Sequence, residues 1–250
     1  SCSLLHVPYT LENETKLEED VKKHFAFAKE KLTELSELAV LTEEAEPENS
    51  EIYKKNQALF ADERLYLDRG VQDAVAALKE EDFHREMARS EREKLQKEEF
   101  GLPLLPTTTI GSFPQTREVK RNRSSYRKGE INKAAYDKQV FAFIKDCIRL
   151  QEDLDIDVLV HGEYERNDMV EFFGENLAGY VFTEKAWVQS YGTRCVKPPI
   201  IFGDVKRIRP ITVSYSEYAQ SLTGRPVKGM LTGPVTILNW SFPREDVSLK

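Results

Sequence analysis

The sequence predicts an α/β protein whose second half forms a small parallel β-sheet. Three apolar stretches with many β-branched residues, at 107–113, 156–163 and 226–238, are typical of strands. Between them lie two stretches whose apolar residues recur at helical spacing, 133–155 and 216–224. Strands that alternate with helices run parallel, because each helix returns the chain to the start of the next strand.

Each of the three predicted strands carries a glycine beside a polar residue towards its C-terminal end. These pairs are Gly111-Ser112, Gly162-Glu163 and Thr232-Gly233. The carboxyl ends of parallel strands share one edge, and α/β barrels and open sheets bind their ligands there. A ligand site at this edge is the first functional hypothesis.

The second strand ends in "DVLVHGEYERND" (157–168), which places His161 and Glu163 two residues apart and therefore on one face. One interpretation is a strand that leaves the core and meets water. A second is a metal-binding pair, which is disfavoured because two ligands are too few for a zinc site. The third is a binding site built at the end of the strand.

The first hundred residues are mainly helical. Apolar residues keep helical spacing from Leu17 to Ala39, and charge-rich helical stretches follow around 51–67 and 71–97. The opening "SLLHVPYT" predicts a short strand that runs into a loop, since Pro8 disfavours helix at Val7. Further along, 179–207 alternates like a β-hairpin with extended arms.

Composition excludes several classes of function. The net charge of −7 argues against nucleic acid or an anionic membrane surface as the main partner. No apolar run approaches the roughly 18 residues of a membrane span, and the start lacks the basic region of a signal peptide. Three widely spaced cysteines do not form a disulfide framework, so we expect a cytoplasmic protein.

Three strands do not close a barrel. An eight-stranded α/β barrel needs about 250 residues, more than follow residue 103. The sheet is therefore either small and open or the first part of a barrel, and the chain could be a piece of something longer.

Four stretches of the chain resemble the cobalamin-independent methionine synthase family. They are "LPTTTIGSFPQT" (105–116), "DVLVHGEYERNDMVEFFGE" (157–175), "WVQSYGTRCVKPP" (187–199) and "KGMLTGPVTILNWSFPRED" (228–246). The resemblance implies an incomplete (β/α)8 barrel of about three strands behind a charged helical linker. Residues 1–42 would end an N-terminal barrel, 43–103 would link two barrels, and 104–250 would begin the C-terminal catalytic barrel.

The resemblance also implies a reaction. In that family a methyl group passes from 5-methyltetrahydrofolate, as its polyglutamate, to homocysteine, giving methionine without cobalamin. A zinc ion holds the homocysteine sulfur as the nucleophilic thiolate, and a proton donor makes folate N5 a better leaving group. The family is mostly monomeric.

Individual positions carry the family's binding roles by resemblance. Ile110, Ser112 and Glu163 match its homocysteine site, where the carboxylate holds the substrate ammonium group. Arg194, Cys195 and Trp240 match its folate site. Arg suits a carboxylate, the Trp ring suits stacking on a pterin, and Cys195 has no partner that would make it a nucleophile. A strand-ending turn at Gly111, a solvated Glu163 and a core Trp240 are the corresponding structural alternatives.

Other residues receive structural or open interpretations. Arg166, Asn167 and Asp168 are expected to brace the loop after Glu163, and Cys147 is expected to lie in the core. The basic run is interpreted as a solvated face, with attraction of the folate glutamate tail as an alternative. It comprises Arg117, Lys120, Arg121, Arg123, Arg127 and Lys128.

The family's zinc ligands and its proton-donor His have no counterpart in this sequence. We therefore expect no metal site, no catalytic residue and no methyl transfer by the 250-residue chain alone. An uncovered sheet edge would favour self-association. Two other functions remain open: a non-catalytic interaction fragment that uses the helices at 15–97, and a related barrel enzyme resembling uroporphyrinogen decarboxylase.

Overall fold

The structure, a computed structural model, describes residues 6–61, 67–189, 192, 195–197 and 199–243. The chain divides into two compact units. Unit 1 comprises residues 1–76, 170–208 and 233–250, and unit 2 comprises 77–169 and 209–232. No helix in the described part of the chain is both long and apolar enough to cross a membrane.

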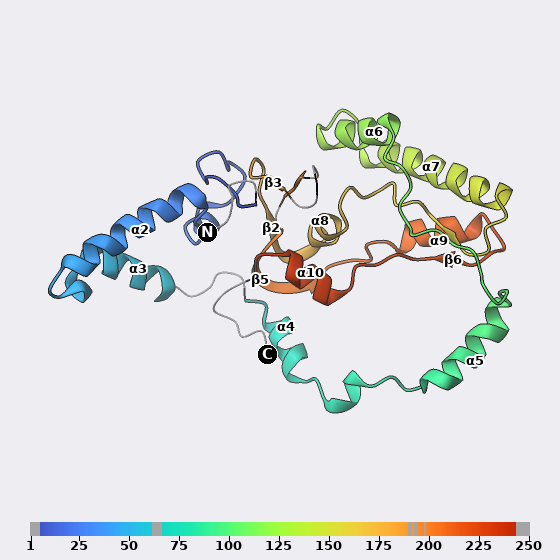
Figure 1. Cartoon of the computed structure of the whole chain (residues 1–250), viewed down its shortest axis with the longest axis horizontal. Coiled ribbons are helices and arrows are strands. Elements are labelled where there is room, and N and C mark those ends of the chain that lie inside the picture. The colour runs from blue at the N-terminus through green and yellow to red at the C-terminus, as the bar shows by residue number, and fades with distance from the viewer. Residues whose placement is uncertain (1–5, 62–66, 190–191, 193–194, 198, 244–250) are drawn as a thin grey trace. The chain divides into compact units, whose positions relative to one another are not determined.

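Unit 2 is built around one long helix (Figure 1). Its elements are η2 (Glu80–Phe83), α5 (Arg89–Phe100), α6 (Arg117–Arg127), α7 (Lys133–Asp153), β1 (Leu159–Val160), α9 (Val213–Ser221) and β6 (Val227–Lys228). The α7 side chains at every fourth position are buried and pack with Leu159, Tyr215 and Ala219; these are Tyr136, Val140, Ile144 and Ile148. Asn132 caps α7 by accepting a hydrogen bond from the Ala135 N–H at 2.9 Å.

Three segments of unit 2 pair in parallel, as the alternation of strands and helices predicts. Residues 108 and 112 bridge to 158 and 162, and β1 pairs with β6 in the register Leu159↔Val227. The segment that contains β1 is therefore the central one, and α7 and α9 occur in the connections along the chain. The strands β1 and β6 have only two residues each. The described fold is mixed α/β with few strands.

The third predicted strand, 226–238, is wrong beyond Lys228. The strand β6 ends there, and α10 (Pro234–Trp240) forms in unit 1. Gly233 occupies the N-cap and Pro234 the first helical position, where its fixed φ and missing N–H favour a helix start. The apolar run "PVTILNW" is thus a helical turn and not the end of a strand.

Unit 1 contains the expected hairpin. The strands β2 (Leu177–Phe182) and β5 (Pro199–Arg207) are antiparallel, with Tyr180 opposite Ile201. The pair β3 (Val188–Gln189) and β4 (Cys195–Val196) lies within the hairpin connection. The helices of unit 1 are α1 (Glu19–Lys22), α2 (Ala28–Glu43), η1 (Pro47–Asn49), α3 (Glu51–Ala61), α4 (Arg69–Ala76) and α10. The helix α8 (Met169–Gly174) also lies in unit 1, except for its first residue, Met169, which belongs to unit 2.

A buried carboxylate joins the start of the described chain to this hairpin. Glu14 is 1% exposed and accepts hydrogen bonds from three consecutive backbone N–H groups, those of residues 184, 185 and 186. Around it Leu11, Leu17, Phe27 and Ala186 form a small apolar core. Unit 1 therefore has a core of its own.

The predicted helix from Leu17 to Ala39 is interrupted. Glu30 accepts hydrogen bonds from the Thr10 hydroxyl, the Leu11 N–H and the Phe27 N–H, at 2.8, 3.1 and 3.2 Å. These bonds hold Phe27 in an extended conformation and start α2 at Ala28. The face of α2 that carries Leu32, Leu35 and Leu38 is exposed.

The short strand expected at the start of "SLLHVPYT" falls mainly on residues 3–5, which lie outside the described residues, and 6–10 have no regular structure. One other prediction in the first half needs correction. The stretch 71–97 is not one helix but α4, η2 and α5, which bury no residue. With so few apolar contacts, nothing holds these segments in one continuous helix.

Candidate substrate site at the sheet edge

The ends of the three parallel segments meet in unit 2. A Cβ added at Gly111 would lie 2.5 Å from Glu163 Oε1 and 2.6 Å from Met230 Cγ, and Met230 follows β6 by two residues. Only a hydrogen atom fits at such distances. Gly111 therefore allows the Glu163 carboxylate to lie against the backbone of the first segment.

Glu163 combines burial with an unusual backbone. Its φ is +59°, directly after Gly162 at +87°. A non-glycine residue in the left-handed region costs on the order of 1 kcal/mol or more and is found often at functional sites. The strand-end turn is held by the Phe113 N–H, which donates to the Gly162 carbonyl at 2.9 Å.

The Glu163 carboxylate has no hydrogen bond or ion pair within the described part of the chain. The residue is nevertheless only 6% exposed. A buried carboxylate is costly unless a cation or donor compensates it. The solvated-acid alternative does not fit this burial, and a ligand cation is a suitable partner.

The other two candidates of this site are accessible. Ser112 is exposed and bridges to Gly162 in the parallel register, which places it beside the turn that carries Glu163. Ile110 is 84% exposed. The structure thus brings Ser112, Gly111 and Glu163 together, with the Ile110 side chain facing open space.

His161 has a different partner from the one that its spacing suggests. It is 1% exposed, and its Nε2 lies 3.0 and 3.2 Å from the two carboxylate oxygens of Glu165. The Arg166 Nε–H donates to Glu165 Oε1 at 2.7 Å. Burial acts to raise the pKa of Glu165, but the His161 hydrogen bond and the charges of His161 and Arg166 outweigh it, so that pKa is lowered.

Arg166 braces the loop as expected, and Arg123 was missed. Arg166 donates from Nη1 to the Met230 carbonyl at 3.0 Å. Arg123 on α6 donates from Nη2 to the carbonyl oxygens of Tyr164 and Arg166, at 3.2 and 2.9 Å. It is 9% exposed, so this part of the basic run is not a solvated face. Its position one helical turn after the buried Val119 is the signal that could have revealed it.

Cys147 lies in the core, as expected. It is 2% exposed and next to Gln151, whose Nε2 donates to the Val160 carbonyl at 2.8 Å. Burial raises the pKa of Cys147 to about 11. This thiol is therefore protonated at neutral pH and serves packing.

Two of the folate candidates, Cys195 and Trp240, belong to unit 1 and lie on separate elements. Arg194 lies outside the described residues. Cys195 is exposed and pairs with Gln189 across the β3–β4 ladder. Trp240 ends α10 and is 52% exposed, so it is not the core tryptophan of the alternative interpretation.

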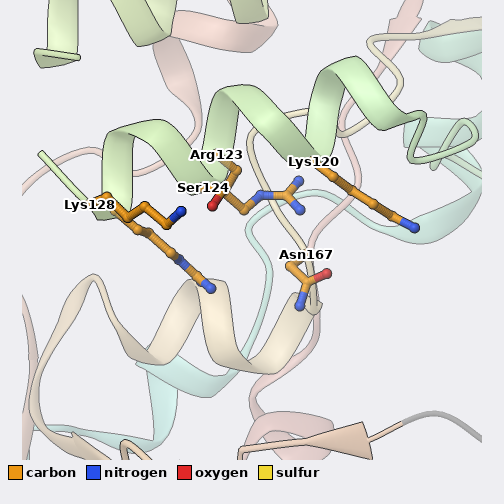
Figure 2. A pocket seen from close by; sticks show the side chains of 6 residues that line it. Lys120, Arg123, Ser124, Lys128 and Asn167 are labelled. Carbon is orange, nitrogen blue, oxygen red and sulfur yellow. The ribbon is translucent and has the colours of Figure 1, made fainter. Parts of the chain in front are cut away.

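Four residues of the basic run, Lys120, Arg123, Arg127 and Lys128, border a cavity of about 390 Å³ in unit 2. Figure 2 shows the side chains that α6 directs towards it and Asn167 on the opposite side. The lining residues are Lys120, Arg123, Ser124, Arg127, Lys128 and Asn167. No acidic side chain is among them.

A family model described as "Cobalamin-independent synthase, Catalytic domain" matches residues 105–250. This match covers more than half of the chain. The chain belongs to the cobalamin-independent synthase family. The matched region includes the three parallel segments, Glu163 and the hairpin.

Curated proteins similar to this member of the cobalamin-independent synthase family share one name, 5-methyltetrahydropteroyltriglutamate–homocysteine methyltransferase. One from Bifidobacterium adolescentis is 59% identical over 248 residues, which cover 98% of this chain and 32% of the relative. One from Lactococcus lactis subsp. cremoris strain MG1363 is 56% identical over 250 residues, covering 100% of this chain and 33% of the relative. The chain thus spans about a third of the length of these relatives.

Among solved structures, the chain is similar to a B12-independent methionine synthase from Shewanella sp. W3-18-1 in complex with selenomethionine. The sequence identity is 22% and the TM-score 0.47, over 58% of this chain and 43% of that chain.

The described residues of this family member do not form a metal site. Within them no group of three or more His, Cys, Asp or Glu side chains is placed to hold a metal ion. Its two described cysteines lie apart in environment, Cys147 buried and Cys195 exposed. The zinc ion implied by the resemblance therefore has no set of ligands among these residues.

Proposed function

We propose that this chain carries part of the substrate sites for methyl transfer from 5-methyltetrahydropteroyltriglutamate to homocysteine, which gives methionine. The names of relatives that are 56–59% identical support this reaction. The observation that carries the assignment of a site is the buried Glu163 carboxylate, which lacks a described partner at the shared edge of the parallel segments. A related decarboxylase-like barrel enzyme has no such support.

The homocysteine part of the site follows from charge. The Glu163 carboxylate would bind the substrate ammonium group, which would offset its burial. Ser112 would offer its exposed hydroxyl to the substrate carboxylate, and Gly111 keeps the two groups close. Held at both polar groups, the amino acid would be oriented with its sulfur directed away from Glu163.

The sulfur chemistry would involve groups other than those described. When bound, zinc would stabilise the homocysteine thiolate, which is the nucleophilic form. Because the family's zinc ligands and proton donor have no counterpart here, we expect the chain by itself to bind substrate without transferring the methyl group. The role of its own residues is to bind and orient.

The folate part is proposed for Trp240, Cys195 and Arg194. The half-exposed indole of Trp240 has a rigid face suited to stacking on a pterin ring. Cys195 would contribute a contact and not a nucleophile. Arg194 would pair with a carboxylate or the pterin edge.

We also propose the domain arrangement that the resemblance implies. Residues 1–42 would complete an N-terminal barrel, and 104–250 would begin a catalytic (β/α)8 barrel that is incomplete in this chain. Between them, 43–103 would form a linker, a role that suits described helices without buried residues. The proposal includes a cytoplasmic location and self-association of the isolated chain through uncovered apolar surface.

A chimera tests the proposed reaction. The segment of the Lactococcus lactis subsp. cremoris relative that aligns with this chain would be replaced by these 250 residues. We expect methionine to form from homocysteine and 5-methyltetrahydropteroyltriglutamate. A chimera that folds by circular dichroism yet forms no methionine would overturn the proposed reaction.

The same chimera tests Glu163. Glu163→Gln keeps the shape and removes the charge, so we expect KM for homocysteine to rise roughly 10- to 100-fold, the worth of a charged hydrogen bond. Glu99→Gln, at an exposed position of α5, is the matched control and should leave KM unchanged. An unchanged KM in Glu163→Gln would remove Glu163 from the site while leaving the reaction standing.

A further inference from the structure

The cavity beside α6 concentrates positive charge on an otherwise acidic chain. Four of its six lining residues are cationic, Lys120, Arg123, Arg127 and Lys128, and the other two, Ser124 and Asn167, can donate hydrogen bonds. The chain as a whole carries a net charge of −7. Like charges around one cavity repel one another, and an anion bound among them would reduce that repulsion.

Arg123 shows that one of these charges is held in place. It is about nine-tenths buried, and its Nη2 is fixed by the Gln115 side chain at 2.6 Å and by two backbone carbonyls. Its Nε–H is buried and has no hydrogen-bond partner among the described residues. A buried donor without an acceptor is uncommon and costs free energy. An anionic ligand in the adjoining cavity would supply both acceptors and the opposite charge.

Both lysines are exposed, and they differ in their partners. Lys120 has no ion pair within the described chain, and the Lys128 ammonium group is 3.8 Å from Glu130 at an exposed position. Figure 2 shows Lys120 and Lys128 at the two ends of the row of side chains, with Arg123 and Ser124 between them. Donors therefore approach the cavity from α6 along its length and from Asn167 on the other side.

We propose that this cavity binds a phosphate-class oxyanion, either free phosphate or the phosphate group of a small molecule. A tetrahedral dianion accepts hydrogen bonds from several directions, which suits two lysines, a fixed arginine, a hydroxyl and an amide. The volume of about 390 Å³ falls within the range of small-molecule sites, about 300–1,000 Å³. This site is separate from the proposed homocysteine site, because Glu163 does not line it.

The binding test uses inorganic phosphate and the full 250-residue chain at low ionic strength, by isothermal titration calorimetry. We expect saturable binding that Lys120→Ala and Lys128→Ala each weaken about tenfold or more. Arg121→Ala removes the same charge from the same helix without touching the cavity, and it should change the affinity less than twofold. All three side chains are exposed, so we expect each variant to fold. Circular dichroism checks this.

Two further titrants identify the ligand. If phenyl phosphate binds more tightly than inorganic phosphate, the site takes a phosphorylated small molecule; the reverse order supports free phosphate. A tri-γ-glutamate peptide that binds more tightly than both would overturn the phosphate assignment in favour of a polycarboxylate. The proposal also fails if phosphate does not bind at 10 mM, or if Arg121→Ala weakens binding as much as the lysine variants.

Discussion

Two features of Glu163 lower the stability of the folded chain. Its backbone is left-handed at φ +59°, and its carboxylate is buried without a described partner. Either feature alone could be incidental, but together they amount to a few kcal/mol of instability at a single strand end. A residue that lowers stability in this way is expected where a ligand restores it. The burial of this carboxylate is therefore better explained by binding than by folding.

Gly111→Ala tests the space reserved for that carboxylate. The new methyl group would lie 2.5 Å from Glu163 Oε1 and must displace it. We expect a loss of about 1–3 kcal/mol of unfolding free energy from overpacking, and a raised KM for homocysteine in the chimera. Urea unfolding and steady-state kinetics provide the two measurements.

The control for Gly111→Ala is Gly224→Ala in the same unit. A Cβ there meets nothing within 4 Å, so stability and KM should stay close to the parent values. If Gly111→Ala leaves both quantities unchanged, the close approach of Glu163 to the first segment does not exist in solution.

At the scale of single residues, the sequence predicts which polar residues lie at the sheet edge better than it predicts the contacts that they make. The pattern Gly162-Glu163 after an apolar strand predicts a polar group at the sheet edge, and the structure has one there. It does not reveal that His161 pairs with Glu165, because that contact depends on how the turn folds back. The basic run also does not show that Arg123 is buried while its neighbours are exposed, because this depends on what α6 packs against.

At the scale of elements, the loop after β1 is held by a compact ionic network. His161, Glu165 and Arg166 are each at most 5% exposed, and Arg166 links them to the Met230 carbonyl. The network thereby fixes the turn that carries Glu163 to the chain beyond β6. Buried ion pairs of this kind contribute little net stability, but removing one partner is expensive because a charge is left uncompensated.

Glu165→Gln tests this network and its pH dependence. The pKa of Glu165 is lowered from its ordinary value of 4.5, so its stabilising effect is complete above pH 4.5 and is lost as the pH falls below that value. We expect the variant to be about 3 kcal/mol less stable at pH 7, with a flatter pH dependence below pH 4.5. Urea unfolding across this range measures both effects.

Glu99→Gln again provides the comparison, since it alters an exposed acid. It should preserve the pH profile of the parent chain. A Glu165→Gln variant that loses stability in acid as steeply as the parent would show that Glu165 does not contribute to the acid transition.

Elements could be predicted where one physical signal dominated. The α7 stripe at positions 136, 140, 144 and 148 is such a case, and α7 forms where expected. The hairpin β2–β5 is another. The strand 226–238 failed because apolar residues suit a strand or a helix equally, and Gly233-Pro234 decides for a helix start. The helix from Leu17 failed because contacts of Glu30 with Thr10, Leu11 and Phe27 set a new helix start at Ala28.

At the scale of the whole molecule, the chain forms two units that interleave along the sequence. Unit 1 takes residues from three separate segments and unit 2 from two. Each has its own apolar cluster, one around Ile144 and one around Leu17. No local pattern predicts such a division, because it depends on contacts between residues more than a hundred positions apart.

Ile144→Ala tests whether unit 2 can lose stability without unit 1. Ile144 is 0% exposed in the core of unit 2, so its truncation should cost about 2–5 kcal/mol. We expect faster amide hydrogen exchange in α7 and α9, with β2 and β5 of unit 1 unaffected. Leu150→Ala, on the same helix but 47% exposed, should change little. Equal loss of protection in both units would instead indicate one cooperative structure.

The contact between Glu14 and the hairpin can form only late during synthesis of the chain. Its three N–H partners are made 170 to 172 residues after Glu14 itself. At about 5–20 residues per second, a ribosome takes roughly 10–30 s to make that stretch. Throughout this interval Leu11, Leu17 and Phe27 have no Ala186 to pack against. The nascent chain therefore carries this apolar segment for many seconds before the last member of its cluster has been synthesised.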